Sequence, residues 1–132
     1  MKSFILTTSF SALFIVSAYA QATVSVKNAA KHIGQTVTVC DKVIDEKLVL
    51  PANNILLNIG SDNPAQTLTV MIRATDRDKF KGKPEIDYRG KDIIVTGKVV
   101  LYKGIPEIVV SDPNHLKLVL VDNPKNPVFK IK

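Results

Sequence analysis

The chain has 132 residues, a length that predicts one domain, and its formal net charge at pH 7 is +6. This basic balance favours anionic partners such as nucleic acid, anionic lipid or cell-wall polymers, without choosing among them. Because the sequence holds one cysteine, Cys40, it excludes a disulfide within the chain and a CxxC redox motif.

Residues 1–20, MKSFILTTSFSALFIVSAYA, are typical of a secretory signal peptide. Lys2 supplies a positive start, an apolar run follows, and Ala18-Tyr19-Ala20 has the small residues of a cleavage site. A second site, after Ala22, is nearly as good. The alternative is a retained membrane anchor, but such a helix needs about 20 mostly apolar residues, and serines and threonines interrupt this run. We therefore expect a periplasmic or secreted protein with no stable membrane anchor after cleavage.

The first half of the mature chain reads as a helix followed by strands. The segment SVKNAAKHIG at 25–34 predicts a short helix that ends at Gly34. Three segments with strand periodicity follow: QTVTVCDKVIDEK at 35–47, NNILLNIG at 53–60 and TLTVMIR at 67–73. The alternation slips near Asp41-Lys42, which predicts a bulge or bend in the first of these strands.

The second half begins with a change of period. TDRDKFKG at 75–82 predicts a short helix or turn, and residues 83–90 are expected to form a loop. KDIIVTGKVVLY at 91–102 and PEIVV at 106–110 predict a hairpin that turns at Lys103-Gly104. LKLVLV at 116–121 is a candidate for a final strand.

This order of elements is that of the OB-fold, a small, partly open, five-stranded Greek-key barrel. We therefore predict an all-β OB-fold domain at 21–121, with a short N-terminal helix and a short helix between strands three and four. A signal peptide at 1–20 precedes it, and a C-terminal tail at 122–132 follows. Gly97 lies mid-strand, where a glycine lets a long strand turn a barrel corner. The alternative is an open sheet that tolerates the glycine.

Two segments, GKDIIVTGKV at 90–99 and YKGIPEI at 102–108, resemble the nucleic-acid-binding-type OB domains of small exported bacterial proteins. That group is similar to the anticodon-binding domains of tRNA synthetases, and the resemblance spans about 31–117. Its motifs describe barrel shape, so it implies the fold more than the ligand. Asn63 stands where such domains often have an aromatic residue, and Asp41 where they often have glycine.

OB-folds bind ligands on the face of strands two and three, bordered by the loops that join strands one to two and four to five. That surface is expected to present Asn58, Thr69, Met71, Arg73, Tyr102 and Lys103. Arg73 and Lys103 would contact phosphates, and Tyr102 would stack on a base. The alternative is that the two cations are solvated charges and the tyrosine packs within its hairpin.

Other chemistry has little support in the sequence. Cys40 lies in the strand-like run TVTVC, where we expect a buried, inert thiol. His32 and His115 are far apart, with no metal-ligand spacing, and no serine lies in a G-x-S-x-G setting. We therefore predict a non-enzyme, without metal or cofactor, that binds single-stranded nucleic acid or a similar anionic polymer. The alternative is an envelope protein-interaction or stress-related module without nucleic-acid binding.

Overall fold

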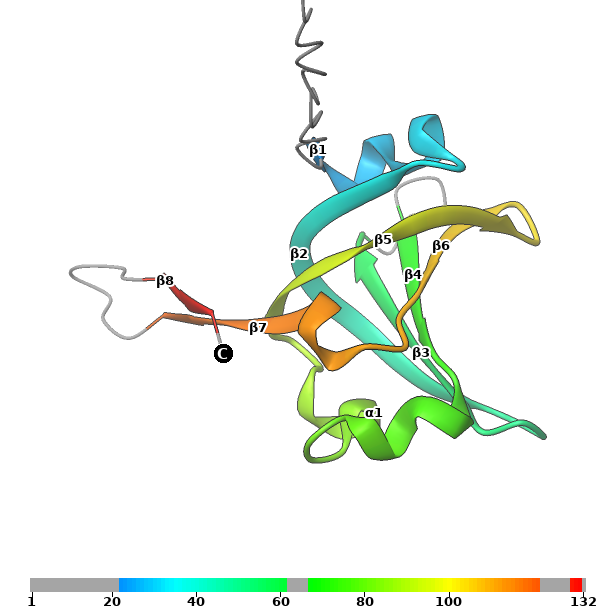
Figure 1. Ribbon diagram of the computed structural model, residues 1–132, viewed down its shortest axis with the longest axis vertical. Helices are drawn as coiled ribbons and strands as arrows, with labels where there is room; N and C mark the ends of the chain where they lie inside the picture. The colour runs from blue at the N-terminus through cyan, green and yellow to red at the C-terminus, as the bar shows by residue number, and fades with distance from the viewer. Residues whose placement is uncertain (1–21, 62–66, 122–128, 132) are drawn as a thin grey trace, which may run out of the picture.

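The computed structural model describes residues 22–61, 67–121 and 129–131. The predicted signal peptide at 1–20, the loop position Asn63 and most of the predicted tail at 122–132 lie outside these residues. The part that is described is mostly β-strand with few and short helices (Figure 1).

The elements, in chain order, are β1 Ala22–Val24, the 3-10 helix η1 Val26–His32, β2 Thr36–Val49, β3 Asn54–Gly60, β4 Thr67–Ile72, the 3-10 helix η3 Ala74–Lys79, α1 Pro84–Asp87, β5 Asp92–Tyr102, β6 Ile105–Val109, the 3-10 helix η4 Pro113–His115, β7 Leu116–Val121 and β8 Phe129–Ile131. The expectation of a loop over residues 83–90 was wrong at Pro84–Asp87, which form α1, while Lys83 and residues 88–90 lie outside any helix or strand. Pro84 occupies the first turn of α1, where the missing N–H and the fixed φ of proline suit a helix start.

Five strands pair in a partly closed ring. β2 pairs with β3, and β3 with β4, both antiparallel. β4 then runs parallel to β6, which is antiparallel to β5, and β5 returns to pair with β2. β1 adds to β2, β7 adds to β5, and β8 pairs with β7 at the far edge (Figure 1). β4 and β6 form the one parallel pair of the ring. This pair places β6, the last ring strand along the chain, beside β4, the third.

The two long strands, β2 and β5, make the ring possible because each changes partner part-way along. β2 pairs with β5 up to Lys42 and with β3 from Val43 onward. Its register shifts between Val43 and Asp45, so that Ile44 is the extra residue of a bulge. The bulge therefore lies slightly beyond the predicted slip at Asp41-Lys42. In the same way β5 leaves β2 at Lys98 and pairs with β6 from Val99.

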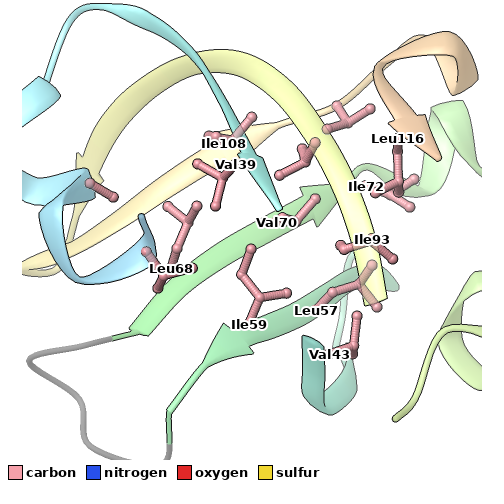
Figure 2. Packing of buried hydrophobic residues seen from close by; sticks show 14 of the residues in the cluster. Val39, Val43, Leu57, Ile59, Leu68, Val70, Ile72, Ile93, Ile108 and Leu116 are labelled. Carbon is pink, nitrogen blue, oxygen red and sulfur yellow. The ribbon is translucent and has the colours of Figure 1, made fainter. Parts of the chain in front are cut away.

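The core fills the inside of the ring (Figure 2). Alternate residues of the ring strands point inward and have no exposed surface: Val37, Val39, Val43, Ile55, Leu57, Ile59, Leu68, Val70, Ile72, Ile93, Val95, Val99 and Ile108. Because side chains alternate between the two faces of a strand, the residues between them point to the outside of the ring. The 3-10 helix η1 lies at one end of the ring, η3 and α1 lie at the other, and η4 lies beside β7 (Figure 1).

The same alternation corrects the expectation for Cys40. Its thiol is exposed, because Val37 and Val39 point inward and Cys40 has the opposite parity. Partial burial, together with the carboxylates of Asp92 and Asp41, nevertheless raises the pKa of the Cys40 thiol. The residue is therefore accessible but poorly ionised.

Candidate binding face

The outer surface of β3, β4 and β6 forms one continuous face. In the register, Asn58 of β3 lies opposite Thr69 of β4, and Thr69 lies opposite Glu107 of β6. These three residues form a polar row that crosses the sheet. A second row beside it is apolar, with Leu56 opposite Met71. The ring therefore collects hydrogen-bonding groups from three separate strands on its outside.

Two hydrogen bonds hold the polar side of this face. The Thr69 hydroxyl donates to Asn58 Oδ1 at 3.1 Å, which fixes both side chains and leaves the amide N–H groups of Asn58 as donors. At the start of β3, Asn54 Oδ1 accepts a hydrogen bond of 3.1 Å from the backbone N–H of Ala74. This bond ties η3 to β3 and so positions the backbone of Arg73, which directly follows β4 and is exposed.

Glu107 is the most unusual group on the face. Only 5% of its surface is exposed, and within the described part of the chain no hydrogen bond or ion pair reaches its carboxylate. Burial raises the pKa of Glu107, and the positive charge of Arg73 acts in the opposite direction. Its carboxylate oxygens are therefore acceptors at the outer surface, and no group of the described residues uses their hydrogen-bonding capacity.

The β5–β6 hairpin borders the face on one side. Lys103 and Gly104 form its turn with positive φ angles of 49° and 79°, the left-handed geometry of a tight two-residue hairpin turn. Lys103 Nζ lies 5.4 Å from the centroid of the Tyr102 ring, within the range of a cation–π contact. Tyr102 is 56% exposed, so the hairpin presents an aromatic ring and a cation together.

A shallow depression of about 250 Å³ lies on this face, lined by Ile44, Asp45, Asn58, Ser61, Thr67, Thr69 and Ile105. Of the sequence-predicted residues, Asn58 and Thr69 line it, and Met71 lies half-buried in the neighbouring row. Arg73 lies beyond the end of β4, and Tyr102 pairs with Ile105 at the rim. The structure therefore places the four predicted strand residues along one face, with the hairpin residues at its border.

Sequence reasoning missed both acidic residues of the face. Asp45, opposite Asn58, forms ion pairs of 3.7 Å with Lys47 and 3.0 Å with Arg89. Glu107 had one available signal, since it is the single charge within the apolar run IPEIVV. Nothing local indicated that this carboxylate would be buried, because the burial depends on β4 and β5 on either side.

The ends of two hairpins carry exposed apolar side chains that the sequence patterns did not indicate. The exposed fractions are 49% for Leu48, 40% for Val49 and 73% for Leu50 at the β2–β3 turn, and 58% for Leu101 on the β5–β6 hairpin. Figure 1 shows both hairpins projecting from the same side of the ring. The binding face is therefore flanked by two apolar projections.

Comparison with known proteins supports a fold for the chain but does not assign it to a family. No known protein family and no curated protein matches the chain. The solved structure of OBody AM1L10 bound to hen egg-white lysozyme is similar, with a TM-score of 0.56 and 18% identity over 78% of this chain and 98% of that one. Yeast Stn1 and Ten1 match with a TM-score of 0.53 and 15% identity over 82% of this chain and 66% of that one. The fold is OB-like.

A protein described as an aspartyl-tRNA synthetase from Leishmania major Friedlin matches with a TM-score of 0.46 and 8% identity. The alignment covers 76% of this chain and 21% of the synthetase, so this chain spans about a fifth of that protein. Over the described residues, no helix is long and apolar enough to cross a membrane. In the same residues, no group of three or more His, Cys, Asp or Glu could hold a metal ion.

Proposed function

We propose that the protein is a non-catalytic binding module that holds a single-stranded nucleic acid, or a similar anionic polymer, on the outer face of β3, β4 and β6. One observation carries the proposal: hydrogen-bonding groups occupy the centre of this face, while cations and an aromatic ring lie at its border. We further propose that the ring is a five-stranded OB barrel. After loss of residues 1–20, the domain would act in the periplasm or outside the cell.

The border cations suit a phosphate backbone. Arg73 and Lys103 are exposed at separate edges of the face. A strand laid across the sheet could place phosphates at these edges and turn its bases toward Asn58 and Thr69. Phosphate contacts provide affinity and position, whereas contacts to base edges provide selectivity.

The expected affinity is modest and depends on salt. Stacking on an aromatic side chain contributes about 1–3 kcal/mol per base, and Tyr102 is the aromatic residue at this border. Most of the binding free energy would then come from the release of counterions. The negative charge of Asp45 should repel the phosphates only weakly, because Lys47 and Arg89 form ion pairs with it.

The decisive experiment is fluorescence anisotropy with a labelled, mixed-sequence DNA strand of about 12 nucleotides, titrated between roughly 50 and 200 mM salt. We expect affinity to fall as salt rises. The double variant Arg73→Ala/Lys103→Ala should bind more weakly and lower the logarithmic salt slope by about 0.7 for each phosphate that is no longer neutralised. The matched control, Lys27→Ala/Lys31→Ala on η1, removes the same charge at an end of the ring. Absence of binding at low salt would remove the proposal.

A protein ligand is the second candidate, and the apolar hairpin ends favour it. Leu50 and Leu101 are more than half exposed on two hairpins that project from the same side of the ring. One similar structure, OBody AM1L10, is itself bound to a protein, hen egg-white lysozyme. Capture of a defined partner from an envelope extract, unaffected by nuclease and abolished by Leu50→Ser/Leu101→Ser, would favour this function over nucleic-acid binding.

A further inference from the structure

The centre of the proposed binding face is rich in hydrogen-bond acceptors. Glu107 is 5% exposed as a residue, and within the described residues its carboxylate has no hydrogen bond or ion pair. Beside it, the Thr69 hydroxyl hydrogen is already donated to Asn58, so that Thr69 offers its oxygen lone pairs. Glu107 and Thr69 are opposite one another in the β4–β6 register, and neighbouring strands lie about 4.8 Å apart. Two adjacent acceptors therefore face outward together.

Such a pair discriminates between ligands by the donors that they bring. A ligand without N–H groups at this point would bury the Glu107 carboxylate and still leave it unpaired. The unpaired group costs about 1–3 kcal/mol, and more when it is charged. A ligand with an amino group satisfies the carboxylate, and its second hydrogen can reach the neighbouring oxygen. Sites built to hydrogen-bond a ligand group reject analogues that lack it.

We infer that Glu107, with Thr69 beside it, makes the proposed nucleic-acid face select bases that carry an exocyclic amino group over thymine and uracil. Cytosine presents its N4 amino group, and adenine its N6 amino group, as donors. Thymine presents carbonyl oxygen at the equivalent position, where it would face the carboxylate oxygen directly. This inference rests on the proposed function and narrows it to amino-bearing single strands.

The preference is not expected to extend evenly across the face. Asn58 lies two strands from Glu107, roughly 10 Å away by the spacing of strands in a sheet. The amide N–H groups of Asn58 remain available as donors, so this end of the polar row can donate to carbonyl oxygens. One base position, the one over Glu107, would therefore carry most of the selectivity.

The test compares labelled oligo-dC and oligo-dT strands of about 12 nucleotides by anisotropy, in a mildly alkaline buffer at low salt. Both are pyrimidines with similar stacking surfaces, so the ratio of their dissociation constants reports the base edge. We expect the wild-type protein to bind oligo-dC roughly tenfold more tightly, as one well-formed base contact provides. Glu107→Gln should bring the ratio close to one, because its amide also donates to carbonyl oxygen.

The control Asp78→Asn removes one negative charge from an exposed position on η3 and should leave the ratio unchanged. Loss of charge at position 107 strengthens binding of both strands, which is why the ratio and not the affinity is the readout. Equal affinities of the wild-type protein for oligo-dC and oligo-dT would overturn this inference while leaving the proposed function intact. Failure to bind any oligonucleotide would overturn both. If Glu107→Gln does not fold, the ratio of the two dissociation constants of the wild-type protein still tests the inference.

Discussion

Gly97 of β5 and Ile108 of β6 are in such close contact that a Cβ atom on Gly97 would lie 2.5 Å from Cγ2 of Ile108. Gly97 has the same inward parity as Val95 and Val99, yet its place in the core is taken by the isoleucine. It lies just before β5 exchanges β2 for β6 as its partner. The glycine is therefore needed for the space it leaves, since its φ angle is not positive.

Gly97→Ala should destabilise the protein by about 1–3 kcal/mol, the usual range for an extra methyl group in a packed core. Urea denaturation at a fixed pH measures the change in the free energy of unfolding. Lys98→Ala, on the exposed neighbouring residue of the same strand, serves as the control and should have a much smaller effect. In the double variant Gly97→Ala/Ile108→Ala, the new methyl group can occupy part of the vacated space. Strict additivity of the two single changes would contradict the contact.

Tyr102→Leu should weaken the binding of single-stranded DNA, because leucine keeps apolar bulk but has no aromatic stacking surface. Loss of about 1–3 kcal/mol of binding free energy raises the dissociation constant roughly 5- to 150-fold. Tyr102→Phe retains the ring and should bind nearly as well as the wild type. Equal affinities of the leucine and phenylalanine variants would show that the tyrosine does not stack on a base. The ring is more than half exposed, so neither change should alter thermal stability much.

Stability should fall as the pH rises above the ordinary pKa of a glutamate, and Glu107 is one cause. Burial raises the pKa of this carboxyl in the folded protein, so between the two pKa values the native state binds more protons than the unfolded chain. The free energy of unfolding therefore decreases through this window and stays lower above it. Glu107→Gln should flatten that decrease and be more stable than the wild type at neutral pH. Burial also raises the pKa of Glu46, so part of the slope should remain.

Denaturation by urea across a pH series distinguishes these contributions. Glu46→Gln should also flatten the decrease, because burial raises the pKa of this carboxyl and its Oε2 atom has no hydrogen-bond partner among the described residues. An unchanged pH dependence in both variants would mean that these carboxyls titrate alike in the folded and unfolded states.

Cys40 should react with iodoacetamide in the native protein, but slowly at neutral pH. The thiol is exposed, while partial burial, Asp92 and Asp41 raise its pKa and so reduce the fraction of reactive thiolate. Asp92→Asn should shift the pH profile of the modification rate to lower pH. Asp112→Asn, which changes an acid that caps η4, is a control expected to leave the profile in place. A thiol that reacts only after denaturation would contradict its exposure.

The mature protein should begin at Gln21. β1 starts at Ala22, which pairs with Val37 in the parallel register of β1 and β2. Cleavage after Ala20 keeps this pair, whereas cleavage after Ala22 removes it and shortens an already short strand. Intact mass spectrometry of protein recovered from a secreting host gives the answer. A mass beginning at Thr23 would favour the second cleavage site, and an uncleaved Met1 would argue against a signal peptide.

Local alternation was enough to place most of the ring strands. NNILLNIG and TLTVMIR predicted strands that the structure has as β3 Asn54–Gly60 and β4 Thr67–Ile72. Period two is a local property, and it tells which side of a strand faces apolar neighbours. Alternation also indicated an outward Cys40, because it lies one residue after the inward Val39. The apolar character of TVTVC led instead to the wrong expectation of a buried thiol.

The candidate face was foreseen in part for the same reason. Asn58 and Thr69 could be placed on the outer side of their strands from alternation, and the register then brings them together in a hydrogen bond. Glu107 could not be foreseen, because its burial depends on β4, a strand that lies far from it in the sequence and pairs with β6 only in the folded ring. Glu107 becomes buried only when β6 packs between β4 and β5.

The amino-acid sequence thus specified which segments are extended and which side chains share a surface, since both depend on contacts a few residues apart. The order of strands around the ring, the parallel pairing of β4 with β6 and the fit of Ile108 against Gly97 came from the folded chain. A strand leaves N–H and C=O groups open along both edges, and these groups are alike in every strand. Packing of the whole core decides which edges pair. The paired strands can lie far apart in the sequence, so a local pattern does not reveal the pairing.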